Sequence, residues 1–128
     1  MSLELKLLIC SVALAFVQML VSVVGAQLQV GLPALAGNRD NWPEITGWAG
    51  RACRAHRNML ESLVLFAILV LAGHAANKLN ATTALGAQLF IWARLAYAVV
   101  YVAGLPWIRT GVWFVSVIGL AMIFFQVV

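Results

Sequence analysis

The sequence predicts an all-α membrane protein, a bundle of four transmembrane helices in a single domain over residues 1–128. Hydrophobic residues make up 64% of the 128 residues, charged residues only 9%, and the mean hydropathy is +0.99. A soluble domain of this length has too little interior to hide so much apolar surface. Four apolar stretches also approach the roughly 20 residues that a helix needs to cross the hydrocarbon core. They are Leu5–Val30, Met59–Ala76, Ala81–Leu105 and Val112–Val128.

The first stretch has two interpretations. Lys6, the apolar run Leu7–Val24 and the small residues Gly25 and Ala26 resemble a cleaved signal peptide. The run is long for the apolar part of a signal peptide, however, and its removal would leave three helices to shield a charged one. We therefore expect a permanent span.

Turn-forming residues separate the remaining spans. Gly31–Gly47 is rich in Gly, Pro, Asn and Asp, so we expect it to be the only substantial loop. The Asn77–Thr83 turn is short and polar, which makes the second and third spans antiparallel neighbours. Pro106 is expected to end the third span, and Thr110 and Gly111 to lead into the fourth.

The formal net charge of +4 does not indicate a nucleic-acid-binding face, because most cations lie beside membrane ends. Under the positive-inside rule they place the loop after the first span and the turn after the third in the cytoplasm. Both termini, with Lys6 and Lys78, then lie on the opposite side. Tryptophans near the same predicted face agree with this orientation, because indole rings settle at headgroup depth. The flanking cations are Arg39, Arg51, Arg54, Arg57 and Arg109, and the tryptophans are Trp42, Trp48 and Trp107.

Cysteine and histidine do not suggest a metal site. Cys10 and Cys53 are too few and too differently placed for a disulfide framework, so we expect buried thiols. His56 and His74 have no companions at metal-ligand spacing. We expect no metal cofactor.

Charged residues at the start of the second span form the first candidate site. Arg51, Arg54, Asn58 and Glu61 fall within about 80° of one another on a helical wheel, with Arg57 at the edge of the stripe. One charged residue at the centre of a transmembrane helix costs about 2.5–3.5 kcal/mol. Such a cluster therefore predicts a functional site.

The third span carries a second polar stripe. Arg94, Tyr97 and Tyr101 have i, i+3, i+7 spacing and lie within about 60° of one another. We expect both stripes to face something other than lipid.

Structural roles remain open for these residues. Glu61 could neutralise Arg54 or Arg94 in an ion network that only fixes helix register. Arg51 could extend to headgroup phosphate, and each tyrosine could serve packing alone. If the stripes bind a ligand, the excess of guanidinium groups favours a small anionic or zwitterionic molecule. Phospholipid headgroups fit the same groups.

The pattern Arg-x-x-Arg-Ala-His-Arg-Asn-x-x-Glu at Arg51–Glu61, with Arg-x-x-Tyr-x-x-x-Tyr at Arg94–Tyr101 and then Arg109, resembles the MAPEG family. These are the membrane-associated proteins in eicosanoid and glutathione metabolism, and the chain looks most like small bacterial members. The resemblance implies a homotrimer in the bacterial inner membrane, with glutathione as co-substrate between subunits near the cytoplasmic face. It also implies that Arg94 ties the third span to Glu61. The implied glutathione-binding residues are Arg51, Arg54, Arg57, Asn58, Glu61, Arg94, Tyr97 and Tyr101.

The resemblance assigns catalysis to Arg109, which would stabilise the glutathione thiolate. A guanidinium beside a thiol lowers its pKa from about 8.5 and raises the reactive fraction. The implied activity is a glutathione transferase or peroxidase acting on lipophilic electrophiles or lipid hydroperoxides. The alternatives are a non-catalytic membrane protein that binds a lipid or thiol metabolite, and a purely structural charge network.

The chain departs from the family pattern at three places. Ser62 follows Glu61 where some members have an aromatic residue. Gly50 stands where many members have Glu, and Gly25–Leu32 supplies Gln27 and Gln29 where some members contribute an Arg to the neighbouring subunit's glutathione. These differences concern the contacts expected for glutathione.

Overall fold

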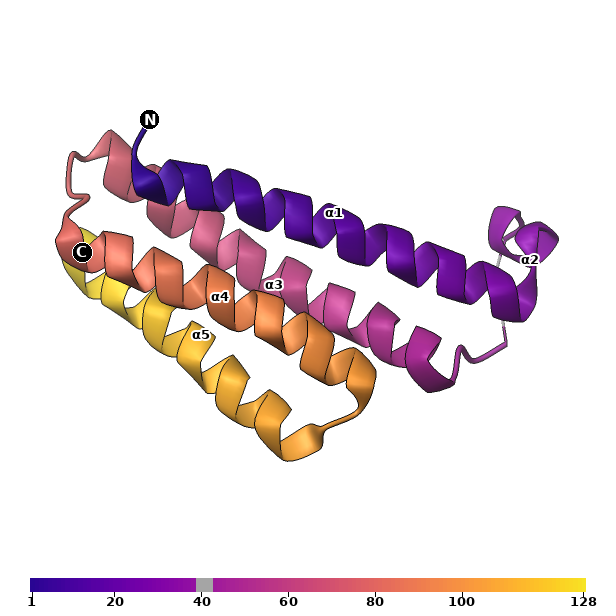
Figure 1. The fold of residues 1–128 in the computed structure, drawn as a ribbon. Coiled ribbons are helices and arrows are strands. Elements are labelled where there is room, and N and C mark those ends of the chain that lie inside the picture. Colours follow the sequence, from indigo (N-terminus) through magenta and orange to yellow (C-terminus); the bar gives the residue numbers. More distant parts are fainter. Residues whose placement is uncertain (39–42) are drawn as a thin grey trace.

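The computed structural model describes residues 1–38 and 43–128 as five helices. Four of the helices in these ranges are long and apolar enough to cross a membrane, which confirms the predicted all-α membrane fold. They lie side by side in the order α1, α3, α4, α5, and both chain termini are at the same end of the bundle (Figure 1). The helices are α1 (Leu3–Val30), α2 (Leu32–Ala36), α3 (Gly47–Ala75), α4 (Ala81–Ala103) and α5 (Pro106–Val127).

Of the expected helix starts, that of the fourth span was wrong. α3 begins at Gly47, so the charged segment forms the first turns of the helix whose apolar part starts near Met59, as its placement on a helical wheel expected. Arginine, alanine and leucine favour helix as such, whereas a hydropathy profile registers only the apolar part. α5 begins at Pro106 rather than near Val112.

Pro106 therefore starts the fourth long helix instead of ending the third. α4 ends at Ala103, and the following Gly104 adopts the left-handed conformation (φ 81°) common after a helix C-terminus. Pro106 then occupies the first turn of α5, where its missing N–H is not needed. Arg109 consequently lies within α5, and its N–H donates to the Leu105 carbonyl at 3.1 Å.

The predicted Gly31–Gly47 loop contains a short helix, α2, with Pro33 in its first turn. The expected roles of Arg39 and Trp42 in membrane orientation fall outside the described residues.

The end of the bundle that carries the termini is held by polar side chains. Glu4 is buried, and its Oε2 accepts a hydrogen bond from Thr83 Oγ1 at 2.7 Å, beside the capped N-terminus of α4. The positive end of the α4 dipole favours a carboxylate there. Asn80 Nδ2 donates to Gln126 Oε1 at 2.8 Å, and Lys78 Nζ to the Val127 carbonyl at 3.1 Å. These bonds connect α1, α4 and α5 at one end.

Small residues let the helices approach closely. A Cβ at Gly25 of α1 would lie 2.7 Å from the Ala49 Cβ of α3. α4 and α5 pack most extensively, and their backbones meet at Gly86 and Gly119, where a Cβ on Gly119 would lie 2.5 Å from the Gly86 carbonyl oxygen. Small residues at crossings are typical of membrane helices, where association depends on close packing.

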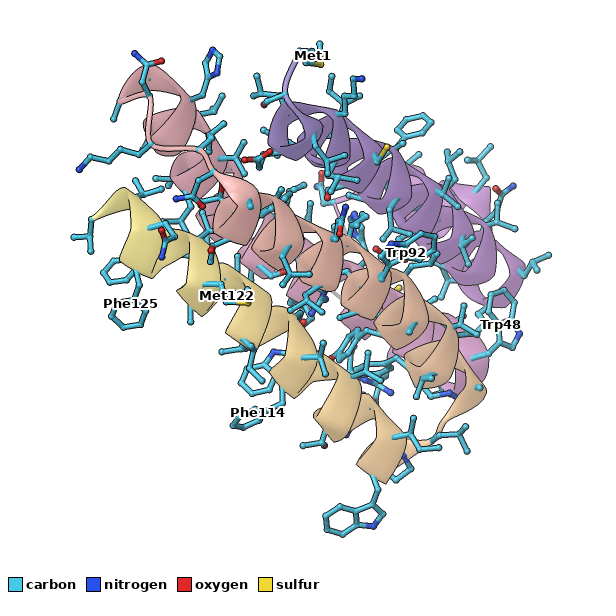
Figure 2. All side chains as sticks on the ribbon, turned by 60° about the vertical axis from the view of Figure 1, so that its left-hand side comes forward. Met1, Trp48, Trp92, Phe114, Met122 and Phe125 are labelled. Carbon is cyan, nitrogen blue, oxygen red and sulfur yellow. The ribbon has the colours of Figure 1, made fainter. Side chains whose placement is uncertain are left out.

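The core lies where α1, α3, α4 and α5 meet. It includes Met59, Phe66 and Phe90, which are fully buried, and the two phenylalanine rings stack with centroids 4.2 Å apart. Large apolar side chains also cover the outside, among them Trp92 (67% exposed) and Phe125 (71% exposed), and Phe125 points away from the bundle (Figure 2). This outer surface suits contact with acyl chains.

The helix crossing predicts a contrast between two glycines of α5. Gly119→Ala should destabilise the protein by about 1–3 kcal/mol, because the added methyl group meets the α4 backbone. Gly111→Ala is the matched control: nothing lies within 4 Å of its added Cβ, so stability should stay the same or rise slightly. Circular dichroism in detergent would measure both melting temperatures. Equal values for the two variants would contradict the close crossing.

Candidate functional site

Tyr101 of α4 connects the two predicted polar stripes. Arg54 Nε of α3 donates a hydrogen bond to Tyr101 Oη at 3.2 Å. Arg109 of α5 lies against the same ring, with its Cζ 4.6 Å from the ring centroid. A guanidinium at this distance from an aromatic ring is attracted by the ring quadrupole. Three helices thus contribute to one cluster around Tyr101.

Tyr97 extends this cluster along α4. The ring centroids of Tyr97 and Tyr101 are 5.4 Å apart. The Cζ of Arg94 lies 4.3 Å from the Tyr97 centroid. The structure therefore brings together Arg54, Arg94, Tyr97, Tyr101 and Arg109.

A small hollow adjoins the cluster. Its volume is about 190 Å³, and its lining comes from α3, α4 and α5. One lining atom, Asn58 Oδ1, is buried and has no hydrogen-bond partner among the described residues. The lining residues are Asn58, Tyr97, Arg109, Thr110 and Trp113.

Thr110 and Trp113 were missed by the sequence analysis. Thr110 was expected to lie in the turn before the fourth span, because that span was expected to start at Val112. Since Arg109 lies on a helix, Trp113 is its i+4 neighbour and shares its face. The signal was present in the spacing, but it required the helix to start at Pro106.

Arg94 is almost completely buried, with 1% of its surface exposed. None of its three guanidinium nitrogens has a hydrogen-bond partner within the described part of the chain. The implied tie between Arg94 and Glu61 is therefore not formed among the described residues of this chain. The guanidinium rests on the Tyr97 ring instead, while Glu61 is exposed on α3.

Arg51 contacts the end of a neighbouring helix. Its Nε donates to the Val102 carbonyl at 2.9 Å, and its side chain packs beside Gly104. The last carbonyls of a helix lack intrahelical partners and carry partial negative charge, so a guanidinium stabilises them. The roles expected for Arg51 were binding to lipid headgroups or to a ligand. The capping contact was not expected, because the sequence does not show where α4 ends.

Arg54, Arg57 and Glu61 are exposed on the surface of α3 within a membrane-spanning helix. Arg54 donates a hydrogen bond to Tyr101, whereas the side chains of Arg57 and Glu61 are exposed on the surface of this single chain. Charges at such positions face a protein neighbour or a wet cavity far more often than acyl chains.

Two of the three departures from the family pattern have local explanations. Gln29 at the end of α1 donates from Nε2 to the Thr46 carbonyl at 2.6 Å and accepts from the Thr46 N–H at 3.0 Å. Its amide therefore holds the start of α3 against α1. A Cβ on Gly50 would collide with the Ile45 carbonyl oxygen, so the bend before α3 leaves no room for a side chain.

The comparison with protein families agrees with this architecture. The family model described as MAPEG family matches residues 7–128, nearly the whole chain. No curated protein and no solved structure matches the chain. Together with the four apolar helices, the family match identifies an integral membrane protein. The family resemblance expected from the sequence is thereby confirmed, and the chain belongs to the MAPEG family.

Proposed function

We propose that the protein is a glutathione-dependent transferase or peroxidase that acts on lipophilic electrophiles or lipid hydroperoxides within the membrane. The family includes enzymes of both kinds. One observation carries the proposal: Arg109 of α5 lies over Tyr101 at the edge of a hollow that also contains Asn58 and Tyr97. A polar hollow bounded by cations inside a bilayer suits an anionic co-substrate.

The groups around the hollow match those of glutathione. Arg54 and Arg57 would bind its carboxylates, because a guanidinium pairs with a carboxylate through two parallel hydrogen bonds. Glu61 and the unpartnered Asn58 Oδ1 would accept from its amino group. Tyr97 and Tyr101 would line the site beside the cysteinyl part.

Arg109 would act on the glutathione sulfur. Its guanidinium favours the thiolate over the thiol, and the N-terminus of α5 adds the positive end of a helix dipole. The thiolate would then attack an electrophilic carbon and form a C–S bond. Either a leaving group such as chloride departs with its bonding electrons, or the π electrons of an activated double bond move to the neighbouring carbon, which takes a proton from water. With a hydroperoxide it would attack the terminal oxygen and release an alcohol, and a second glutathione would complete the reduction with formation of the disulfide and water.

The exposed charges of α3 support assembly as a homotrimer. Arg57 and Glu61 extend from the isolated chain, and buried Arg94 has no hydrogen-bond partner among the described residues. A neighbouring subunit would cover these groups and close the glutathione site between protomers. In the bacterial inner membrane, the end that carries α2 would face the cytoplasm, and the two termini would face the other side (Figure 1).

A non-catalytic role is the second candidate. The Arg109 guanidinium rests on the Tyr101 ring, which already stabilises part of its positive charge. A guanidinium held in this way could bind a lipid or thiol metabolite without taking part in any reaction.

Substitution of Arg109 tests the catalytic role. Arg109→Ala should lower glutathione conjugation to 1-chloro-2,4-dinitrobenzene and reduction of cumene hydroperoxide by about a hundredfold, because the developing thiolate loses its counter-charge. Arg109→Lys keeps the charge and should retain part of the activity. Calorimetry should show nearly unchanged glutathione binding for both variants.

Wild-type turnover no higher than that of Arg109→Ala would remove the catalytic assignment. In that case, glutathione binding without turnover would favour the non-catalytic role. Failure to bind any thiol would favour a structural charge network.

Substitutions should assign Arg57 to glutathione binding and Arg51 to the stability of the fold. Arg57→Ala should weaken glutathione binding about tenfold, because it loses a charged hydrogen bond to the ligand, while the melting temperature of the ligand-free protein stays constant. Arg51→Ala should lower that melting temperature by a few degrees, because Val102 loses its hydrogen-bond donor. Calorimetry and thermal unfolding would measure the two effects. The reverse pattern would contradict both assignments.

A further inference from the structure

A second cavity lies on the opposite face of α3 and α4 from the polar hollow. It is a groove of about 460 Å³ between α1, α3 and α4, and its size falls within the range of ligand pockets. Its lining includes Val17, Gln18, Ala52, Ala55, Val99 and Val102. α1 and α4 diverge here, toward the end that carries α2, and α3 lies between them (Figure 1).

Gln18 is the polar residue of this otherwise apolar lining. Only 8% of its surface is exposed, and its side-chain Oε1 is buried without a hydrogen-bond partner in the described ranges. The neighbouring Ser22 hydroxyl does not supply one, because it donates to the Gln18 main-chain carbonyl at 2.8 Å. A buried amide without a partner is destabilising, and even more so beside hydrocarbon.

We propose that the groove binds a lipophilic molecule that carries a hydroxyl group, with the hydroxyl on Gln18 and the hydrocarbon along α4. A hydroxyl both donates and accepts, so it pairs with either end of the Gln18 amide. The apolar walls formed by Val17, Val99 and Val102 fit a hydrocarbon chain. The proposal is independent of glutathione, since the groove contains none of the residues around Arg109.

Two other possible occupants of the groove would leave Gln18 Oε1 without a hydrogen-bond partner. The acyl tails of ordinary phospholipids can fill the groove, but a hydrocarbon offers nothing to Gln18 Oε1. A second copy of this chain could cover the groove, yet the residues exposed around it, such as Val17, Leu95 and Val99, are apolar. An unpaired acceptor instead selects an occupant with a donor group.

Photocrosslinking of the full chain in phosphatidylcholine nanodiscs tests the proposal. The probe is hexadecanol with a mid-chain diazirine, and its control is hexadecane with the same diazirine. Mass spectrometry should find the alcohol attached around Val99 and Val102 about tenfold more than the alkane, because one buried hydrogen bond distinguishes the two. Competition with unlabelled farnesol should remove this labelling.

Three variants make the test specific. Gln18→Leu keeps the volume of the side chain and removes an unpartnered amide, so the protein should fold normally and lose its preference for the alcohol. Ala98→Phe fills the groove and should abolish labelling by both probes. Ala96→Phe is the matched control, because Ala96 is exposed on the same helix and does not line the groove.

Equal labelling by alcohol and alkane in the wild-type protein would overturn the proposal. So would a preference that survives Gln18→Leu, or crosslinks from the groove to a second copy of the chain. If Gln18→Leu fails to fold, insensitivity of the alcohol labelling to Ala98→Phe would overturn it. Loss of glutathione turnover in Arg109→Ala leaves these outcomes unchanged, so the two proposals fail separately.

Discussion

Guanidinium groups lie against tyrosine rings where α3, α4 and α5 meet, toward the end of the bundle that carries α2, and the arrangement of these three helices depends on that contact. Arg94 rests on Tyr97, and Arg54 and Arg109 meet at Tyr101. Arg94 is almost completely buried, so the aromatic face provides part of the stabilisation that hydration would provide elsewhere. Because α3 and α5 each bring a guanidinium to a tyrosine of α4, rotation of any of the three helices would break at least one of these contacts.

The meeting of these side chains depends in turn on how closely α4 and α5 approach. Their backbones touch at Gly86 and Gly119, whereas Gly104 and Pro106 form the turn at the other end. Arg51 stabilises that turn by bonding to the Val102 carbonyl. Arg109 therefore reaches Tyr101 from a helix whose position is determined at both ends. This accounts for a polar hollow that is narrow yet lined by three helices.

Much of the fold could be predicted from the sequence, because apolar length is the dominant requirement for crossing a bilayer. The four spans and the two polar stripes follow from composition and helical periodicity alone. Helix starts were harder: the charged residues of α3 and the Pro106 start of α5 are invisible to hydropathy. The contact between Arg51 and Val102, the isolation of Arg94 and the position of Trp113 depend on where α4 ends and α5 begins. Such long-range geometry is absent from local sequence patterns.

The two ends of the bundle are held to different degrees. At the end with the termini, Glu4, Asn80 and Lys78 connect α1, α4 and α5 through side-chain hydrogen bonds. At the other end α1 diverges from α4, and the amide of Gln29 is bonded to α3 rather than to α4. At this end Gln29 links α1 to the start of α3, and Arg51 and Arg54 link α3 to α4, whereas the groove separates α1 from α4. A bulkier molecule in the groove would therefore be accommodated by movement of α1 relative to α4 at this end, while the polar hollow between α3, α4 and α5 keeps its shape.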